Sequence, residues 1–293
     1  MPTCGLGQLG LFIGLLVGLF TTGPVWLGLV LGGLVIGTLW GALSPAAARH
    51  RREPDYGLFV KSDLVRRALA EAIAAFALVF AGAGAIVADA AYDGVLGSVG
   101  IALVFGLIIM VMVYATGHLS GAHINPAVTL AFVLTRHFSP RDAAAYIAGQ
   151  LAGATLAALL LLALWPHQPG DIGATVPSIA PWRALVYEIV LTAFLMFVIM
   201  AVATDVRAVG GAAAIAIGGA VGLDALFGGP VTGASMNPAR SFGPALAAWQ
   251  WDDFWVYVIG PLAGAALGGF AYQLVRGGRA SVGAPTTERR PVE

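Results

Sequence analysis

Residues 120–127 read SGAHINPA, and residues 232–239, far along the chain, read TGASMNPA. Both stretches keep a hydroxyl residue, Gly-Ala, two variable residues and then Asn-Pro-Ala. Asn is a preferred helix N-cap and Pro is favoured in the first helical turn, so each Asn-Pro-Ala predicts the start of a helix rather than a break in one.

The composition places these helix starts in a membrane. The chain of 293 residues is 59% hydrophobic and 10% charged, and its mean hydropathy is +0.87. These values are typical of an integral membrane protein and exclude a water-soluble one. A helix needs about 20 apolar residues to cross a bilayer, and the stretches of suitable length are 69–87, 99–116, 143–164, 184–203, 211–228 and 254–275.

Two apolar runs that follow the repeated asparagines are too short to cross. They cover roughly 125–134 and 237–248. Short segments at matching places of two halves are typical of an inverted repeat with broken helices. The sequence therefore predicts an all-α membrane protein with six transmembrane helices and two re-entrant half-helices.

The positive charges orient this arrangement. All Lys and Arg residues except Arg183 and Arg240 fall on one side of it, and cytoplasmic loops are enriched in these residues. We therefore expect the C-terminus in the cytoplasm. Arg240 follows the second motif directly, at a depth where a charge is costly and by default functional. The alternative is an interfacial anchor, because Arg side chains often snorkel.

The two ends of the chain need a separate account. Residues 1–48 form an apolar, Gly-rich extension without Lys or Arg, so the basic region of a secretory signal is missing. Residues 25–43 are long enough for an extra helix; the alternatives are a poorly packed extension or a start codon assigned too early. The polar tail 277–293 is expected to be disordered. The only cysteine, Cys4, excludes an intrachain disulfide.

Further motifs surround the two repeats. They are the stretch 117–123 with His118 and His123, Ser241 after Arg240, Gly260-Pro261, and one membrane glutamate in each half, Glu71 and Glu188. With these features the chain resembles the aquaporin, or major intrinsic protein, family over residues 66–276. The resemblance implies a bundle of six tilted helices with two half-helices, in halves of about 68–165 and 184–275. It also implies a multi-pass protein of the plasma or inner membrane and one pore per protomer of a homotetramer.

The expected activity is passive conduction. The N-termini of two opposed half-helices each carry about half a positive charge, which repels cations. If Asn125 and Asn237 cap their helices with the side-chain oxygen, the amide nitrogens are left to donate to a passing solute and to interrupt a proton wire. No cofactor, metal, nucleic-acid partner or enzymatic activity is expected. The sequence contains no Gly-rich phosphate-binding loop, no cluster of metal ligands and no Ser-His-Asp order that a pore would not explain better.

Several side chains admit two interpretations. Glu71 and Glu188 could relay protons, or, as the resemblance implies, accept hydrogen bonds from the re-entrant backbone. His118 and His123 could bind a metal or gate by pH, but the spacing offers no third ligand nearby, so scaffold hydrogen bonding is the favoured role. The motif residues expected at the pore are Asn125, Pro126, Ala127, Asn237, Pro238 and Ala239.

The resemblance also implies an outer constriction formed by Phe105, Ala225, Ala234 and Arg240, called the filter positions below. Water-selective members commonly have His at the place of Ala225. Ser241 directly after Arg240 resembles the water channels of the family at this position. The pair Tyr257-Val258 instead resembles the plant nodulin-like group. We expect conduction of water and of small uncharged solutes such as glycerol, urea, ammonia or metalloid acids. The alternatives are a water-only channel, a proton-coupled secondary transporter and a non-conducting adhesion protein.

Overall fold

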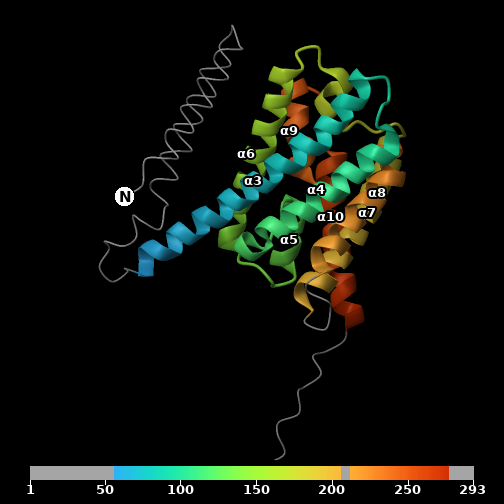
Figure 1. The fold of residues 1–293 in the computed structure, drawn as a ribbon. Helices are drawn as coiled ribbons and strands as arrows, with labels where there is room; N and C mark the ends of the chain where they lie inside the picture. Colours follow the sequence, from blue (N-terminus) through green and yellow to red (C-terminus); the bar gives the residue numbers. More distant parts are fainter. Residues whose placement is uncertain (1–55, 206–211, 277–293) are drawn as a thin grey trace, which may run out of the picture. The chain divides into compact units, whose positions relative to one another are not determined.

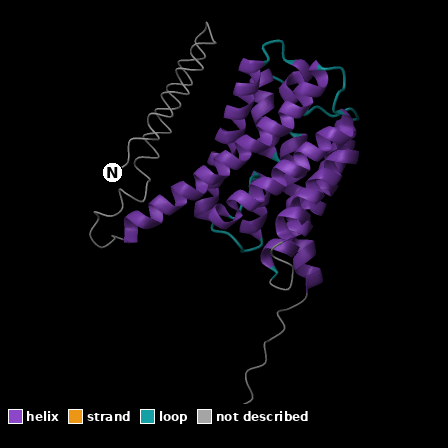
Figure 2. Cartoon of the chain, in the orientation of Figure 1, coloured by secondary structure: helices purple, strands orange, loops and turns teal. Residues whose placement is uncertain are grey.

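The computed structural model describes residues 56–205 and 212–276. Within these ranges the chain is helical and has no strand, as Figure 2 shows. The predicted helix at 25–43 and the tail 277–293 lie outside the described residues. The elements are α3 (Tyr56–Ala91), α4 (Gly97–Ser120), α5 (Pro126–Leu134), α6 (Pro140–Leu164), the 3-10 turn η2 (Pro169–Gly173), α7 (Pro181–Thr204), α8 (Ala213–Thr232), α9 (Pro238–Ala248) and α10 (Val256–Arg276).

Six of the described helices are long and apolar enough to cross a membrane, namely α3 from Asp63 onward, α4, α6, α7, α8 and α10. The prediction of six spans is confirmed. Helices α4 and α8 run about one turn further than predicted, to Ser120 and Thr232. Both end at a glycine in the left-handed conformation, Gly121 and Gly233, whose N–H bonds back into the last turn.

The two short helices, α5 and α9, begin directly after the repeated asparagines. Their 9 and 11 residues correspond to about 14 and 17 Å, roughly half of a bilayer core. In each helix Pro occupies the first turn and Asn is the N-cap. Figure 1 shows α9 toward the upper end of the bundle and α5 toward the lower end. Two short helices thus approach each other from opposite ends.

Small residues allow the long helices to pack closely. A Cβ atom at Gly106 of α4 would lie 2.8 Å from the carbonyl oxygen of Gly218 and 3.0 Å from Cα of Gly222, both on α8. Such close backbone contact is typical of helix interfaces in membranes, where small side chains let the helices approach. The contact places α4 and α8 side by side, with their inner faces toward the ends of α5 and α9.

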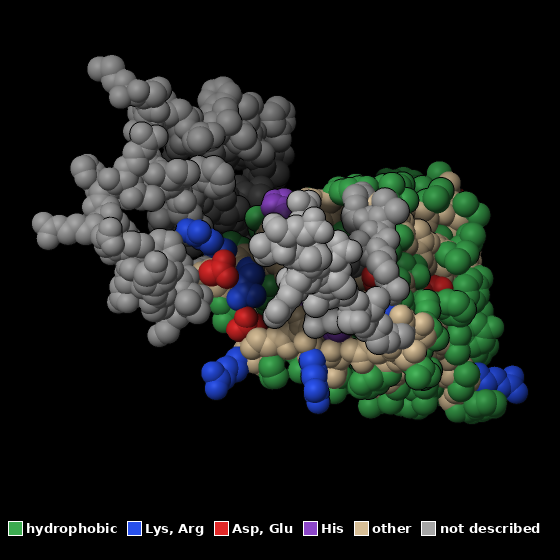
Figure 3. Space-filling view, turned by 90° about the horizontal axis from the view of Figure 1, so that it is seen from below, with side chains coloured by type: hydrophobic (Ala, Val, Ile, Leu, Met, Phe, Trp, Pro, Cys, Tyr) green, Lys and Arg blue, Asp and Glu red, His purple; other side chains and the backbone are tan. Residues whose placement is uncertain are grey.

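Basic side chains gather at one end of the bundle. Figure 3 looks at this end from below, where Lys and Arg side chains stand around its edge. The described arginines of this end lie near the start of the membrane-spanning part of α3 (Arg66, Arg67), after α5 (Arg136), at the beginning of α6 (Arg141) and at the end of α10 (Arg276). Arg183 lies in the first turn of α7, at the other end. The distribution matches the one-sided charge pattern of the sequence.

Candidate functional site: the meeting point of α5 and α9

The two asparagines bind each other's loop. The Asn125 side-chain oxygen accepts from Ala127 N at 2.8 Å, and its Nδ2 donates to Met236 O at 2.7 Å. In the other half, Asn237 accepts from Ala239 N at 3.0 Å and donates to Ile124 O at 2.9 Å. The helix starts are therefore held together by two reciprocal hydrogen bonds. The expectation of free amide nitrogens is corrected accordingly, because one N–H of each amide is already used.

Each loop is also held by a buried carboxylate. Glu71 of α3 accepts from His123 N at 3.0 Å and from Ile124 N at 2.6 Å. Glu188 of α7 accepts from Ser235 N at 3.0 Å and from Met236 N at 2.8 Å. Both carboxylates are fully buried. The geometry matches the interpretation in which these glutamates accept hydrogen bonds from the loop backbone.

The carboxylates stabilise an unusual backbone. Ala122 and Ile124 in the first loop and Ala234 and Met236 in the second all have positive φ, between 40° and 56°. For residues with a side chain this conformation costs free energy and persists only where surrounding contacts enforce it. The amide of one positive-φ residue in each loop is bonded to its glutamate. The two loops therefore have the same strained shape for the same reason.

Two tyrosines extend the pairing of the halves. The Tyr146 hydroxyl donates to Ser120 O, and the Tyr257 hydroxyl donates to Thr232 O, each at 2.6 Å. Both carbonyls end the helix that leads into a loop. The sequence analysis did not predict that these two tyrosines hold the loops. The signal that could have shown it is the similarity between YIAGQ at 146–150 and YVIGP at 257–261.

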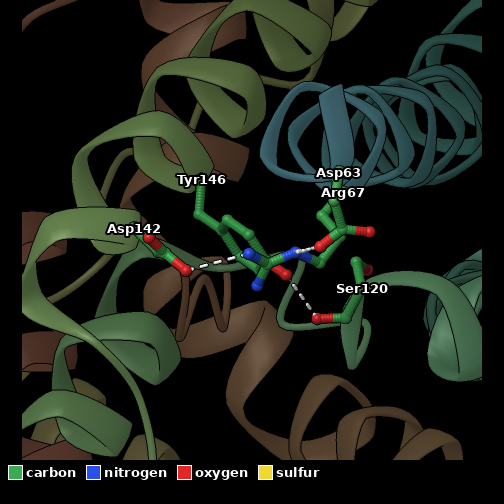
Figure 4. Close-up of polar contacts among 5 residues, drawn as sticks. All are labelled: Asp63, Arg67, Ser120, Asp142 and Tyr146. Carbon is green, nitrogen blue, oxygen red and sulfur yellow. Dashed lines mark hydrogen bonds and ion pairs between the residues drawn. The ribbon is translucent and has the colours of Figure 1, made fainter. Parts of the chain in front are cut away.

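The first loop has an additional tether that the second lacks. Figure 4 shows Arg67 between Asp63 and Asp142, with its nitrogens 2.9 Å from an oxygen of each. The guanidinium carbon lies 5.8 Å from the ring centre of Tyr146, which bonds to Ser120. Four residues before Glu188, the place equivalent to Arg67 holds alanine. Among the described residues, this link joins the charged end of the bundle to the first loop and has no counterpart at the second.

The two histidines differ in their surroundings. His123 Nδ1 lies 3.1 Å from Thr129 Oγ1, and its ring contacts those of Phe132 and Tyr146. The equivalent place in the second loop is Ser235, whose hydroxyl lies 2.6 Å from Ser241 Oγ. His118 is exposed on α4, and its side chain makes no hydrogen bond to the other described residues. His123 and Ser241 therefore both make hydrogen bonds within the scaffold of the loops. The structure does not bring His118 into the site.

A narrow cavity passes the meeting point of the short helices. It has a volume of about 60 Å³ and is lined by both asparagines and by all four filter positions. Most of its other walls are apolar, with Ile109, Val128 and Leu195 among them. Pro126, Ala127, Pro238 and Ala239 are buried behind this lining. The residues predicted for the pore are therefore gathered around one passage.

Arg240 is fixed at the edge of this cavity. Its Nη1 donates to Gly173 O at 2.8 Å, and its guanidinium carbon lies 5.0 Å from the ring centre of Phe105. The ring of Phe105 in turn packs against Gly82 of α3, where a Cβ would come within 2.6 Å of it. The sequence did not predict roles for these two glycines. Gly173 contributes only a backbone carbonyl oxygen, and Gly82 contributes only the space that a side chain would fill.

Comparison with known proteins now decides the family. The family described as major intrinsic protein matches residues 59–272. The chain belongs to the major intrinsic protein family. Members of this family are channels rather than enzymes, so the protein is a multi-pass membrane channel of the aquaporin type.

The relatives of this major intrinsic protein include plant channels. Aquaporin NIP1-4 of Oryza sativa is 48% identical over 220 residues, which cover 75% of this chain and 80% of the relative. Nodulin-26 of Glycine max is 44% identical over 217 residues, covering 74% and 80%. The aquaglyceroporin structure from Plasmodium falciparum has a TM-score of 0.65 at 26% identity, covering 73% of this chain and 97% of that one. The predicted likeness to nodulin-like members is confirmed.

Proposed function

We propose that this channel conducts water and small uncharged solutes, such as glycerol, urea, ammonia or metalloid acids, and excludes protons and ions. The observation that carries the proposal is the composition of the cavity wall at the filter positions. Phe105 and Arg240 face the passage there together with two alanines, Ala225 and Ala234. Alanine leaves the opening wide and adds no polar group, so it favours solutes larger than water.

Arg240 supplies hydrogen-bond donors and positive charge at this constriction. One nitrogen is used by Gly173 O, which leaves further N–H groups of the guanidinium for a solute oxygen. Phe105 offers an apolar wall next to these donors. A polyol presents hydroxyl groups on one side and C–H groups on the other, so it fits a constriction with one polar and one apolar side.

Proton exclusion is assigned to the meeting point of α5 and α9. Both helices point their positive ends toward it, which disfavours any cation. An amide nitrogen carries two hydrogens, so Asn125 and Asn237 each retain one N–H beside the cross-loop bond. A water that accepts from both asparagines turns its own hydrogens away along the passage. The chain of hydrogen bonds that proton hopping needs is thereby interrupted.

Glu71 and Glu188 have a structural role in this proposal. Each carboxylate accepts from two loop amides and from a hydroxyl, Ser120 or Thr232. A proton carrier must release these bonds in every cycle, which the strained loops oppose. This observation favours a passive channel over a proton-coupled transporter. We assign the channel domain to residues 66–276, with halves at about 68–165 and 184–275.

The remaining assignments concern assembly and location. We assign the basic end of the bundle, and with it the C-terminus, to the cytoplasm, because Lys and Arg accumulate on that side of membranes. The protein is assigned to the plasma or inner membrane. A homotetramer is the assembly implied by its family. Chemical cross-linking in the membrane tests this assembly, and a ladder that stops before four copies would contradict it.

Solute uptake by proteoliposomes tests the proposed selectivity. Stopped-flow light scattering follows swelling in water, glycerol and urea gradients, with protein-free liposomes as the background. We expect permeability to all three. The matched variant Ala225→His narrows the constriction and should lower glycerol flux more than water flux. Water flux without glycerol or urea flux in the natural sequence would establish the water-only channel, and saturating, gradient-coupled flux would establish a transporter.

A further inference from the structure

The connection between α6 and α7 is bonded to the first turn of α9 at two points. This connection covers residues 165–180 and contains η2. Its Gly173 carbonyl oxygen accepts from Arg240 Nη1 at 2.8 Å, and its Thr175 hydroxyl donates to Ser241 Oγ at 2.7 Å. Two nearby residues of the connection are therefore bonded to two consecutive residues of the helix that carries the filter arginine.

The Thr175–Ser241 bond is the stiffer of these two contacts. Both side chains are short; Thr175 is 5% exposed and Ser241 is fully buried. The methyl group of Thr175 packs at Gly233, where a Cβ atom would lie 3.1 Å from it. An arginine side chain, in contrast, has several rotatable bonds and a large conformational freedom. The short bond therefore sets the separation between the connection and α9, and Arg240 adjusts to it.

The Thr175 hydroxyl begins a chain of hydrogen bonds that ends at the second pore asparagine. Ser241 Oγ lies 2.6 Å from Ser235 Oγ, and the Ser235 hydroxyl donates to Asn237 O at 2.9 Å. A hydroxyl group has a single hydrogen, so Ser241 is the donor in its bond to Ser235. The three hydroxyl groups thus donate in one direction. They join the α6–α7 connection to the residue that caps α9.

The first half of the molecule satisfies the equivalent hydroxyl in another way. Thr129 occupies the place of Ser241, four residues after the pore asparagine, and it accepts from Gln150 Nε2 of α6 at 3.1 Å. The place equivalent to Gln150 in α10 holds Pro261, which has no side-chain donor. Thr175 supplies this donor instead. The second half therefore takes from the α6–α7 connection a contact that the first half makes between its own helices.

The position of Arg240 depends on this connection. The residue is 3% exposed, and its Nε has no hydrogen-bond partner among the described residues. Within the same part of the chain, Gly173 O is the only acceptor that the guanidinium has. A shift of the connection away from α9 would carry this acceptor with it. The guanidinium would then lose the contact that fixes it at the cavity wall, and the filter would no longer hold one opening.

We propose that Thr175 is a positioning residue for solute selection, which acts through Ser241 and Gly173 on Arg240. Thr175 does not line the cavity, so it does not touch a passing solute. Its hydroxyl keeps the α6–α7 connection against α9 and thereby keeps the constriction at one size. The proposal rests on the channel function proposed above and adds a residue that determines its size limit.

Thr175→Val tests the proposal, because valine keeps the shape of threonine and replaces the hydroxyl by a methyl group. A methyl group cannot approach Ser241 Oγ to 2.7 Å, so the connection must move away from α9. Loss of one ordinary hydrogen bond shifts the equilibrium toward a detached connection about fivefold. Hydrogen–deuterium exchange of the full chain in lipid nanodiscs should therefore be about fivefold faster in residues 165–180. Ala174 N and Ser178 N are hydrogen-bonded there and report the change.

Entry of erythritol into proteoliposomes is the functional readout, since this polyol is one carbon longer than glycerol. The detached connection is the minor state and limits erythritol entry, whereas glycerol passes through the main state. Thr175→Val should therefore raise erythritol entry about fivefold and leave glycerol entry nearly unchanged. Thr175→Ser keeps the hydroxyl and should restore the natural values. Ser241→Ala removes the acceptor without adding bulk and should give the same changes as Thr175→Val, also where the valine variant fails to fold.

Ser178→Ala is the matched control. Ser178 lies in the same connection and donates to Pro230 O and Val231 O at 2.9 Å, but it is exposed, so water replaces its bond. It should resemble the natural sequence in both measurements. Unchanged exchange in Thr175→Val, faster exchange with unchanged erythritol entry, or no restoration by Thr175→Ser would overturn the proposal.

A lower melting temperature of Thr175→Val without either change would assign this residue to stability alone and would also overturn the proposal. Hydrogen exchange is measured without any solute. A natural channel that conducts no glycerol would therefore refute the proposed selectivity, while the exchange result would still decide on the contact of Thr175.

Discussion

The substitution Glu188→Gln removes one acceptor oxygen from the group that holds the second loop. The two carboxylate oxygens face Ser235 N and Met236 N, at 3.0 and 2.8 Å. In either orientation of the new amide, its NH2 group points at one of these backbone N–H groups. One buried donor then loses its acceptor next to the strained residue Met236. We expect a less stable loop and reduced water conduction.

The size of this effect follows from the lost bond. A buried donor left without a partner costs about 1–3 kcal/mol. For a domain of this size each kcal/mol lowers the melting temperature by about 2–4 °C. The structure predicts a loss of the same kind for Glu71→Gln, because Glu71 binds His123 N and Ile124 N in the same way. Glu71 also accepts from Gln150 Nε2, and the equivalent place in the second half holds Pro261. Each half of the molecule therefore offers one variant that tests the same structural role.

The assay combines thermal unfolding in detergent with stopped-flow water permeability of proteoliposomes. A structural role predicts that both variants melt earlier and conduct less water. A proton relay predicts a different result, in which Glu188→Gln keeps the melting temperature and changes only the pH dependence of flux. That result would refute the role assigned to the glutamates.

Three further predictions concern the filter positions. Ala234→Cys should make water flux sensitive to mercurials, since this side chain lines the cavity; unchanged flux in the mercury-treated variant would show that the filter is placed wrongly. Arg240→Ala should admit larger solutes or cations, measured by solute swelling and by conductance, and unchanged selectivity would count against the arginine. Gly82→Ala should push the Phe105 ring toward Arg240, because the new Cβ would come within 2.6 Å of the ring; glycerol swelling should slow more than water swelling, and an unaltered ratio would contradict this packing.

The sequence predicted the parts of the site that rest on local chemistry. Asn followed by Pro has a definite preference for a helix start, and α5 and α9 begin within one residue of the predicted positions. Long apolar runs likewise predicted the six spans. The charge of Arg240 at membrane depth indicated a functional residue, and the structure places this residue at the wall of the cavity.

The rest depends on contacts between distant segments. The reciprocal bonds of Asn125 and Asn237 join residues more than a hundred positions apart, and no local pattern encodes them. The carbonyl of Gly173 comes from an irregular turn, η2, in which Asp171 and Ile172 have positive φ. Periodicity gives no signal for such a turn. Thr175 was not singled out either, because its bond to α9 exists only in the folded bundle.

Recording of water flux and proton flux in the same preparation of proteoliposomes tests the central claim most directly. Proteoliposomes that contain a pH-sensitive dye are exposed to an osmotic gradient and, separately, to a pH gradient. Two opposed helix starts joined through Asn125 and Asn237 predict water flux well above that of protein-free liposomes, with proton entry no faster than theirs. Proton entry that rises together with water flux, or water flux equal to that of protein-free liposomes, would contradict the account.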